Sequence, residues 1–183
     1  SHLLRHGLRD WHTSVEEVHL EGKVSGLYMG NLLRSILDRE VILGTIERCP
    51  EVDFHFLGSL DVDNLNQWVD DAARSFIKKL KSYKNVHLLG SRPANQVASY
   101  IKAASFCWIA YDLVRAPEQF DSHKTLEYLS QGKPVFSTPM ESWTGNDLVL
   151  TFQSAAELSS MLKRIEDYQT DIDVDKRVKH AFA

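Results

Sequence analysis

The chain has 183 residues, of which 43% are hydrophobic and 25% are charged, as expected for one soluble globular domain with a hydrophobic core. Its formal net charge of −4 argues against a nucleic-acid-binding protein, because such proteins usually carry an excess of basic residues. No apolar run approaches the ~18 residues needed to span a bilayer, and the N-terminus lacks the pattern of a signal peptide.

From residue 23 onward, short runs of β-favouring residues alternate with segments of helical periodicity, whereas residues 1–22 show neither pattern clearly. We expect strands at 23–29, 52–57, 85–89, 106–111, from 135 and at 148–152. We expect helices at 38–48, 64–83, 95–103, between 122 and Gly132, from a capping box at 154–157 to 165, and at 171–182.

Two of these elements have the clearest patterns. Apolar residues recur at helical spacing throughout 64–83, with Asp63 or Asn64 as the candidate N-cap, so we interpret this stripe as core packing. The run from Phe106 to Tyr111 is apolar throughout, which predicts a strand buried on both faces of a parallel sheet.

Cys107 lies inside that run and is expected to be a buried free thiol. Two cysteines provide no disulfide framework and fit a reducing compartment.

This order of elements predicts an α/β fold, a Rossmann-like parallel sheet of about six strands with helices on both faces. Right-handed crossovers place the carboxyl ends of the strands at one edge, where such sheets bind ligands. The turns after Gly30, Gly58 and Gly90 are expected at that edge, together with the loop 112–124. We divide the chain into a lead-in segment (1–22), a ligand-binding domain (23–168) and a C-terminal helical tail (169–183).

The stretch 119–135, QFDSHKTLEYLSQGKPV, carries the most specific chemical pattern. A polar loop runs into a short helix that Gly132 and Pro134 end. A helix N-terminus has unpaired N–H groups and a partial positive charge that suit a phosphate, and Lys124 adds a full charge there. Glu127 lies one turn further on the same side. The alternative, which the spacing alone leaves open, is a solvated surface pair of Lys124 and Glu127.

Several familiar catalytic motifs are absent from the sequence. It has no G-x-G-x-x-G, no G-x-x-x-x-G-K-[ST], no G-x-S-x-G and no H-E-x-x-H, so ordinary dinucleotide, P-loop, serine-hydrolase and zinc chemistry lose support. His55 and His87 lie within expected strands and are interpreted as packed or surface residues. His123 differs, because it lies in the loop beside the candidate phosphate site.

The run from Ser122 to Val135 resembles the donor-site signature of GT-B glycosyltransferases of the group 1, family-four-like type, approximately S-x-K-x-x-E-Y-L-A-x-G-K-P-V-V. Weaker similarities occur in the order expected for the C-terminal domain of that family, over residues 1 to about 165. They are LRHGLR at 4–9, YMGNL at 28–32, the pattern P-x-x-x-F-x-x-x-G from Pro50 to Gly58, and NVHLLG at 85–90.

The resemblance implies a donor-binding domain that transfers a sugar from a nucleotide-diphosphate sugar to an unidentified acceptor, as in polysaccharide biosynthesis. Glu127 then binds the donor ribose, and Lys124 with the helix N-terminus binds the diphosphate; these two are the expected catalytic residues. The resemblance implies the following donor-binding residues: Gly30, Asn31, Ser91, Arg92, Ser122, His123, Lys124, Thr125 and Glu127. Neither a metal nor a cofactor is expected, because the helix dipole and a cation stabilise the leaving phosphate.

Three positions depart from the pattern of retaining members. Gln119 stands where many carry a Glu, Asn31 where many carry an Arg, and Ile36 where many carry a Lys. Arg34 and Arg115 are the candidate substitutes for the missing basic residues, but neither is in register. The resemblance therefore leaves retaining and inverting transfer open.

The chain begins at Ser1, and GT-B enzymes have a second, N-terminal domain, so we expect this piece to bind a nucleotide diphosphate weakly and to turn over nothing alone. The expected partners are the donor and that missing domain, without nucleic acid. The expected location is cytoplasmic, with any attachment to the inner face of a membrane made through the absent half. A sugar-nucleotide 2-epimerase half and a non-catalytic nucleotide-sugar-binding or assembly module remain alternatives.

Overall fold

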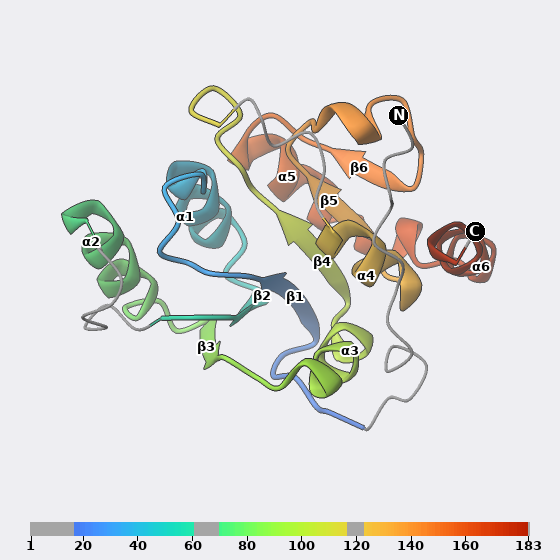
Figure 1. Ribbon diagram of the computed structural model, residues 1–183, viewed down its shortest axis with the longest axis horizontal. Coiled ribbons are helices and arrows are strands. Elements are labelled where there is room, and N and C mark those ends of the chain that lie inside the picture. Colours follow the sequence, from blue (N-terminus) through green and yellow to red (C-terminus); the bar gives the residue numbers. More distant parts are fainter. Residues whose placement is uncertain (1–16, 61–69, 117–122, 183) are drawn as a thin grey trace.

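The computed structural model describes residues 17–60, 70–116 and 123–182, and these residues form one parallel sheet of six strands in the order β3-β2-β1-β4-β5-β6 (Figure 1). Each neighbouring pair in that order is parallel. The strands are β1 (Val24–Met29), β2 (Val52–Leu57), β3 (Val86–Gly90), β4 (Phe106–Ile109), β5 (Val135–Ser137) and β6 (Val149–Thr151).

Helices cover both faces of the sheet. Figure 1 shows α1, α2 and α5 on one face and α3, α4 and α6 on the other. The helices are α1 (Arg39–Arg48), α2 (Asp71–Leu80), α3 (Ala94–Ala103), α4 (His123–Ser130), α5 (Ala155–Leu162) and α6 (Asp171–Ala181), with 3-10 turns at η2 (Glu141–Trp143) and η3 (Ile165–Tyr168). The predicted α/β, Rossmann-like architecture is confirmed.

Aromatic side chains of the central strands pack against one another in the core. The ring of Phe54 lies 5.4 Å from that of Trp108, and the ring of Phe106 lies 5.6 Å from that of Phe136. All four residues of β4 are buried, as the apolar run predicted. Cys107 is a buried free thiol whose pKa is raised by burial, and Cys49 is likewise free and buried.

Two expected helices differ from the prediction by three residues or more at one or both ends. The helix expected at 64–83 begins at Asp71 and ends at Leu80. Asp70 has an extended backbone, and its carboxylate accepts a hydrogen bond from the Ala73 N–H, so Asp70 itself is the N-cap. Acidic side chains compete for backbone N–H groups in this way, which favours helix starts over helix interiors. The expected caps Asp63 and Asn64 lie outside the described residues. Similarly, the helix expected to reach 165 ends at Leu162, and Ile165 belongs to η3.

The stop signal after α4 works as the sequence predicted. Gly132 has a φ of +69°, and its N–H donates to the Leu129 carbonyl at 2.9 Å, while the Lys133 N–H donates to the Tyr128 carbonyl at 3.3 Å. This pair of bonds is a Schellman motif, which satisfies carbonyls that the helix end leaves unpaired. The chain then turns directly into β5.

The C-terminal helix is attached to this turn. Arg177 of α6 is buried and donates to the carbonyl oxygens of Gly132, at 3.2 Å, and Tyr168, at 2.7 Å. α6 therefore packs against α4 on the same face of the sheet. The division into segments 1–22, 23–168 and 169–183 remains a prediction, and residues 1–16 of the first segment lie outside the described part.

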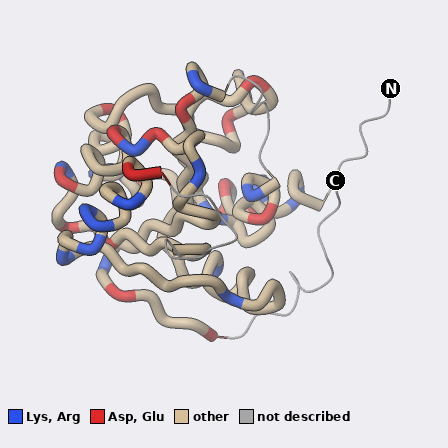
Figure 2. Tube along the Cα trace, turned by 60° about the vertical axis from the view of Figure 1, so that its left-hand side comes forward, with Lys and Arg blue, Asp and Glu red and all other residues tan. Residues whose placement is uncertain are grey.

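Basic and acidic residues are interspersed along the described chain (Figure 2). Some form ion pairs, as between Lys79 and Glu47 at 3.1 Å. Within the described residues, no helix combines the length and the apolar character that crossing a membrane would require.

Candidate functional site

Three glycine turns meet at the carboxyl edge of the sheet. The Gly30 N–H, just after β1, donates to the Leu57 carbonyl at the end of β2, at 2.8 Å. The Gly58 N–H, just after β2, donates to the Gly90 carbonyl at the end of β3, at 3.0 Å. A Cβ on Gly58 would lie only 1.9 Å from the Gly30 carbonyl oxygen, so the first two turns touch through their backbones. The expectation that these loops share one edge is confirmed.

Lys124 projects from the first turn of α4 to the end of β1. Its Nζ donates to the Tyr111 hydroxyl at 2.9 Å and lies 5.4 Å from the ring centroids of both Tyr28 and Tyr111. A Cβ on Gly30 would lie 2.6 Å from that Nζ. The fold therefore brings Gly30 and Lys124 together, and the ammonium bonds to Tyr111, which follows β4.

The tyrosines around Lys124 are buried. Tyr28 and Tyr111 are 1% and 3% exposed. Burial raises the pKa of Tyr28 well above its usual value, the neighbouring Tyr111 raises it further, and the positive charge of Arg34 opposes the rise. Sequence reasoning missed both residues. The available signal was a phenol at or near the carboxyl end of each apolar run, where its hydroxyl can reach the ligand edge.

A third tyrosine fixes α4 against the sheet. Tyr128 is fully buried, and its hydroxyl accepts a hydrogen bond from the Met29 N–H at 2.9 Å. β1 pairs with β4 only at Gly26 and Leu27, so the N–H of Met29 has passed the end of that pairing. The phenol takes the place of the missing strand neighbour and sets the position of the helix relative to the end of β1.

The other predicted residues of α4 lie in different surroundings. Thr125 is completely buried, and its Oγ1 has no hydrogen-bond partner among the described residues, so this residue can offer a ligand only its backbone N–H. Glu127 is partly buried, and His123 is exposed at the start of the helix. Ser122 and Gln119 lie outside the described residues.

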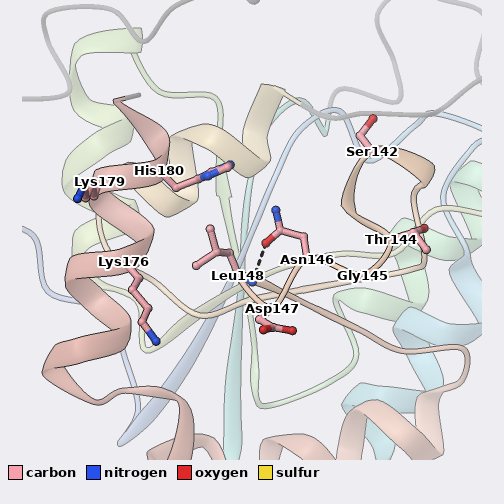
Figure 3. A pocket seen from close by; sticks show the side chains of 9 residues that line it. All are labelled: Ser142, Thr144, Gly145, Asn146, Asp147, Leu148, Lys176, Lys179 and His180. Carbon is pink, nitrogen blue, oxygen red and sulfur yellow. Dashed lines mark hydrogen bonds between the residues drawn. The ribbon is translucent and has the colours of Figure 1, made fainter.

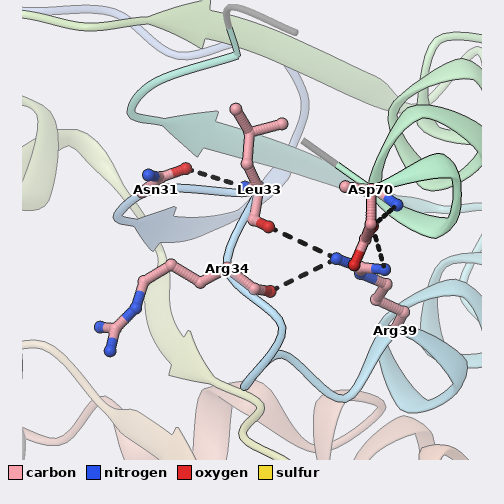
Figure 4. A network of polar contacts seen from close by, with 6 residues as sticks. Asn31, Leu33, Arg34, Arg39 and Asp70 are labelled. Atoms are coloured by element: carbon pink, nitrogen blue, oxygen red, sulfur yellow. Dashed lines mark hydrogen bonds and ion pairs between the residues drawn. The ribbon is translucent and has the colours of Figure 1, made fainter. Parts of the chain in front are cut away.

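The turn after Gly30 uses its polar residues locally. The Asn31 side-chain oxygen accepts a hydrogen bond from the Leu33 N–H at 2.8 Å (Figure 4). Figure 4 also shows the Arg34 side chain pointing away from the ion pair of Arg39 and Asp70. The partly buried side chain of Ile36 packs against the core. Arg115, the second candidate substitute, is exposed and pairs with Asp112 at 3.0 Å.

The turn after β3 holds the two remaining predicted residues. Ser91 and Arg92 are exposed, and the Arg92 Nε donates to the Tyr100 hydroxyl at 2.9 Å, so the guanidinium lies on α3. β3 is separated from β4 by β2 and β1. Three strand spacings of ~4.8 Å put about 14 Å between the turn after β3 and the end of β4, where Tyr111 follows.

A cavity of about 820 Å³ lies elsewhere, between α6 and the loop before β6 (Figure 3). None of the predicted site residues lines it. Among residues 17–60, 70–116 and 123–182, no cluster of three or more His, Cys, Asp or Glu side chains is placed to hold a metal ion.

No protein-family model and no curated protein matches the sequence. Solved structures do match. Sucrose-phosphate synthase from Thermosynechococcus elongatus superposes with a TM-score of 0.64 at 16% identity, over 89% of this chain and 42% of that one. HepE from Anabaena, in complex with UDP-glucose, gives 0.64 at 17% identity, over 87% of this chain and 44% of that one.

A solved structure of an isolated domain shows which part of these larger proteins the present chain matches. The C-terminal domain of the group 1 glycosyl transferase LpcC from Francisella tularensis gives a TM-score of 0.55 at 13% identity, over 88% of this chain and 83% of that domain. The fold is that of a GT-B C-terminal domain. The UDP-GlcNAc 2-epimerase from Neisseria meningitidis also superposes on this chain, with a TM-score of 0.54. The present chain spans about two fifths of the length of the larger relatives, and at these identities the likeness establishes the fold alone.

Proposed function

We propose that this chain is the donor-binding domain of a glycosyltransferase and holds a nucleoside-diphosphate sugar at the carboxyl edge of its sheet. One observation carries the proposal. The ammonium of Lys124 lies beside the backbone of Gly30, in the first turn of α4, at the edge where the glycine turns meet. A cation, a helix N-terminus and a backbone without a side chain together suit a diphosphate.

Each group has a defined task in the proposed reaction. Lys124 and the N–H groups at the start of α4 bind the diphosphate. They stabilise the charge that grows on it as its bond to the anomeric carbon of the sugar breaks and an acceptor oxygen bonds to that carbon. Glu127, one turn further along α4, accepts hydrogen bonds from the ribose hydroxyls. The turn at Ser91 and Arg92 lies about 14 Å across the sheet from the end of β4, by strand spacing, and in this proposal it contacts the nucleotide base. In this scheme the charge is stabilised without a metal ion.

A second candidate is one half of a sugar-nucleotide 2-epimerase, since the 2-epimerase from Neisseria meningitidis, bound to UDP-GlcNAc, has the same fold with a TM-score of 0.54. Both activities need the same nucleotide-sugar site, so they predict the same ligand for this chain. A non-catalytic binding module is the third candidate, favoured by Asn31 and Ile36, neither of which supplies a cation to the turn after β1.

Catalysis is expected to require a complementary domain, because the larger GT-B chains are more than twice as long as this one. That domain supplies the acceptor site in the proposed complete protein, along with any attachment to a membrane. Residues 1–183 alone are therefore expected to bind donor nucleotide and to give no sugar transfer in an assay with labelled nucleotide sugars. Transfer by this chain alone would contradict that part of the proposal.

The binding proposal is tested by calorimetry with UDP, GDP and ADP. Lys124→Ala and Glu127→Gln should each lower the affinity for the nucleotide roughly 10-fold or more, since a hydrogen bond to a charged group contributes about 1.5–3 kcal/mol. Lys179→Ala removes an exposed cation beside the separate cavity and is the matched control. The proposal fails if no nucleotide binds, or if both site variants bind as tightly as the control.

A further inference from the structure

A lysine on the surface is a poor fixed charge, because its ammonium sits at the end of a flexible four-carbon stem. Lys124 is different in this respect. Its ammonium donates to the Tyr111 hydroxyl at 2.9 Å and lies over two aromatic rings. Both contacts are made by residues of the chain itself, so the fold holds the cation at this edge of the sheet.

The residue that holds the ammonium is itself fixed. Tyr111 is 3% exposed, its N–H donates to the Thr138 Oγ1 at 3.1 Å, and its backbone pairs with Leu37 in an antiparallel bridge. The hydroxyl therefore has a defined position at the end of β4. Tyr28 supplies the second ring from the end of β1 and is also buried.

A phenol is suited to hold a cation that must still act on a ligand. An ammonium has three N–H donors, so one bond to Tyr111 leaves two for phosphate oxygens. The neutral phenol also leaves the positive charge uncompensated, whereas a carboxylate partner would neutralise it. The surface lysine Lys79 shows the contrast, because its ammonium lies 3.1 Å from the carboxylate of Glu47.

Gly30 is needed for the same arrangement. A Cβ at this position would lie 2.6 Å from the Lys124 Nζ, closer than real Cβ contacts allow, and 3.1 Å from the Tyr28 hydroxyl, which is tighter than most such contacts. Any side chain at position 30 would therefore displace the ammonium, in addition to the strain of a φ of +142°.

We propose that Tyr111 is a positioning residue that fixes the Lys124 ammonium for binding the diphosphate, and that Gly30 leaves the space which this position requires. Neither needs to touch the ligand through a side chain, since each acts through Lys124. The assignment of the ligand rests on the proposed function, whereas the fixing of the ammonium does not.

The first test needs no ligand. Acylation of individual lysines by an amine-reactive ester, followed by mass spectrometry, measures how accessible each amine is. Tyr111→Phe keeps the ring and removes the hydroxyl, so the rate at Lys124 should rise several-fold while the rate at the exposed Lys102 stays unchanged. Tyr100→Phe, which removes the hydroxyl that Arg92 uses, is the matched control and should leave Lys124 unchanged. An unchanged rate at Lys124 in Tyr111→Phe would overturn the proposal.

The second test is a double-mutant cycle read by UDP affinity. Tyr111→Phe should lower the affinity for UDP about 3- to 10-fold and leave the affinity for uridine unchanged. In a Lys124→Ala background it should have no further effect on UDP affinity. A purely structural role for Tyr111 predicts instead an equal loss in both backgrounds, and that result would refute action through Lys124. Absence of UDP binding in the wild type would count against the proposed function, and the acylation rates would still decide the positioning role.

Discussion

The contact between the first two glycine turns makes Gly58 the position where a single methyl group should do most damage. A Cβ there would lie 1.9 Å from the Gly30 carbonyl oxygen, 2.5 Å from its carbonyl carbon and 3.2 Å from its nitrogen. These are backbone atoms, so no side chain can rotate away to relieve the collision. Gly58→Ala must therefore push the turn after β2 away from the turn after β1.

The size of the effect follows from the bonds that hold these turns. Separation would stretch the bond from the Gly30 N–H to Leu57, at 2.8 Å, and that from the Gly58 N–H to Gly90, at 3.0 Å. Losing both costs about 2 kcal/mol, at ~1 kcal/mol for each bond. Residual backbone strain adds roughly 1–3 kcal/mol. We expect Gly58→Ala to lower the free energy of unfolding by about 3–5 kcal/mol in total.

Gly145→Ala is the matched control. Gly145 also has a positive φ, of +73°, but a Cβ there would meet no atom within 4 Å. Its cost is the left-handed backbone alone, about 1–2 kcal/mol, partly offset by a less flexible unfolded chain. Thermal unfolding followed by circular dichroism should show a fall in Tm of roughly 6–20 °C for Gly58→Ala and of at most about 6 °C for Gly145→Ala. Equal falls would show that the turns do not touch as described.

Two further predictions concern buried ionisable side chains. The pKa of His55 is lowered from 6.5 to about 4, mainly by burial and secondly by the neighbouring His87. Between pH 4 and 6.5, His55 is therefore protonated in the unfolded chain and neutral in the folded chain. Stability should fall by an amount on the order of 1–3 kcal/mol as pH decreases from about 6.5 to about 4, and His55→Phe should remove this part of the pH dependence in urea titrations; an unchanged profile would contradict it. Arg177→Met removes both bonds that tie α6 to the Gly132 turn and to Tyr168, and should cost about 2–4 kcal/mol by urea denaturation. Arg164→Met, which removes an exposed ion pair with Asp167, should cost no more than about 1 kcal/mol, and equal losses would disprove a specific role for Arg177.

The architecture was readable from the sequence because local signals agreed with it. The strand at 52–57 has the predicted bounds, and Asp38 and Ser154 cap their helices with side-chain hydrogen bonds. Errors arose where two local preferences competed. The apolar residues of 64–83 recur at helical spacing, but the Asp70 carboxylate caps a helix that begins at 71. Apolar spacing cannot predict this start, because it depends on a hydrogen bond from the backbone to a side chain.

The candidate site was only partly predictable. Lys124 and Gly30 could be placed at one edge by topology, and the structure puts them side by side. The role of Tyr111 depends on a contact between two elements, and no spacing along the chain encodes it. Arg92 shows the converse limit, because the sequence places it at the carboxyl edge of the sheet but cannot show that its guanidinium bonds to Tyr100 of the following helix, α3.

The bond between Met29 and Tyr128 gives the molecule an internal reporter. The Met29 amide belongs to a strand but donates to a phenol on α4, whereas the next amide, of Gly30, donates across to β2. Hydrogen exchange at these two adjacent amides therefore records different events, separation of the helix from the sheet and fraying of the sheet itself. One pair of neighbouring protons thus separates the motion of the proposed phosphate-binding helix from that of the scaffold that carries it.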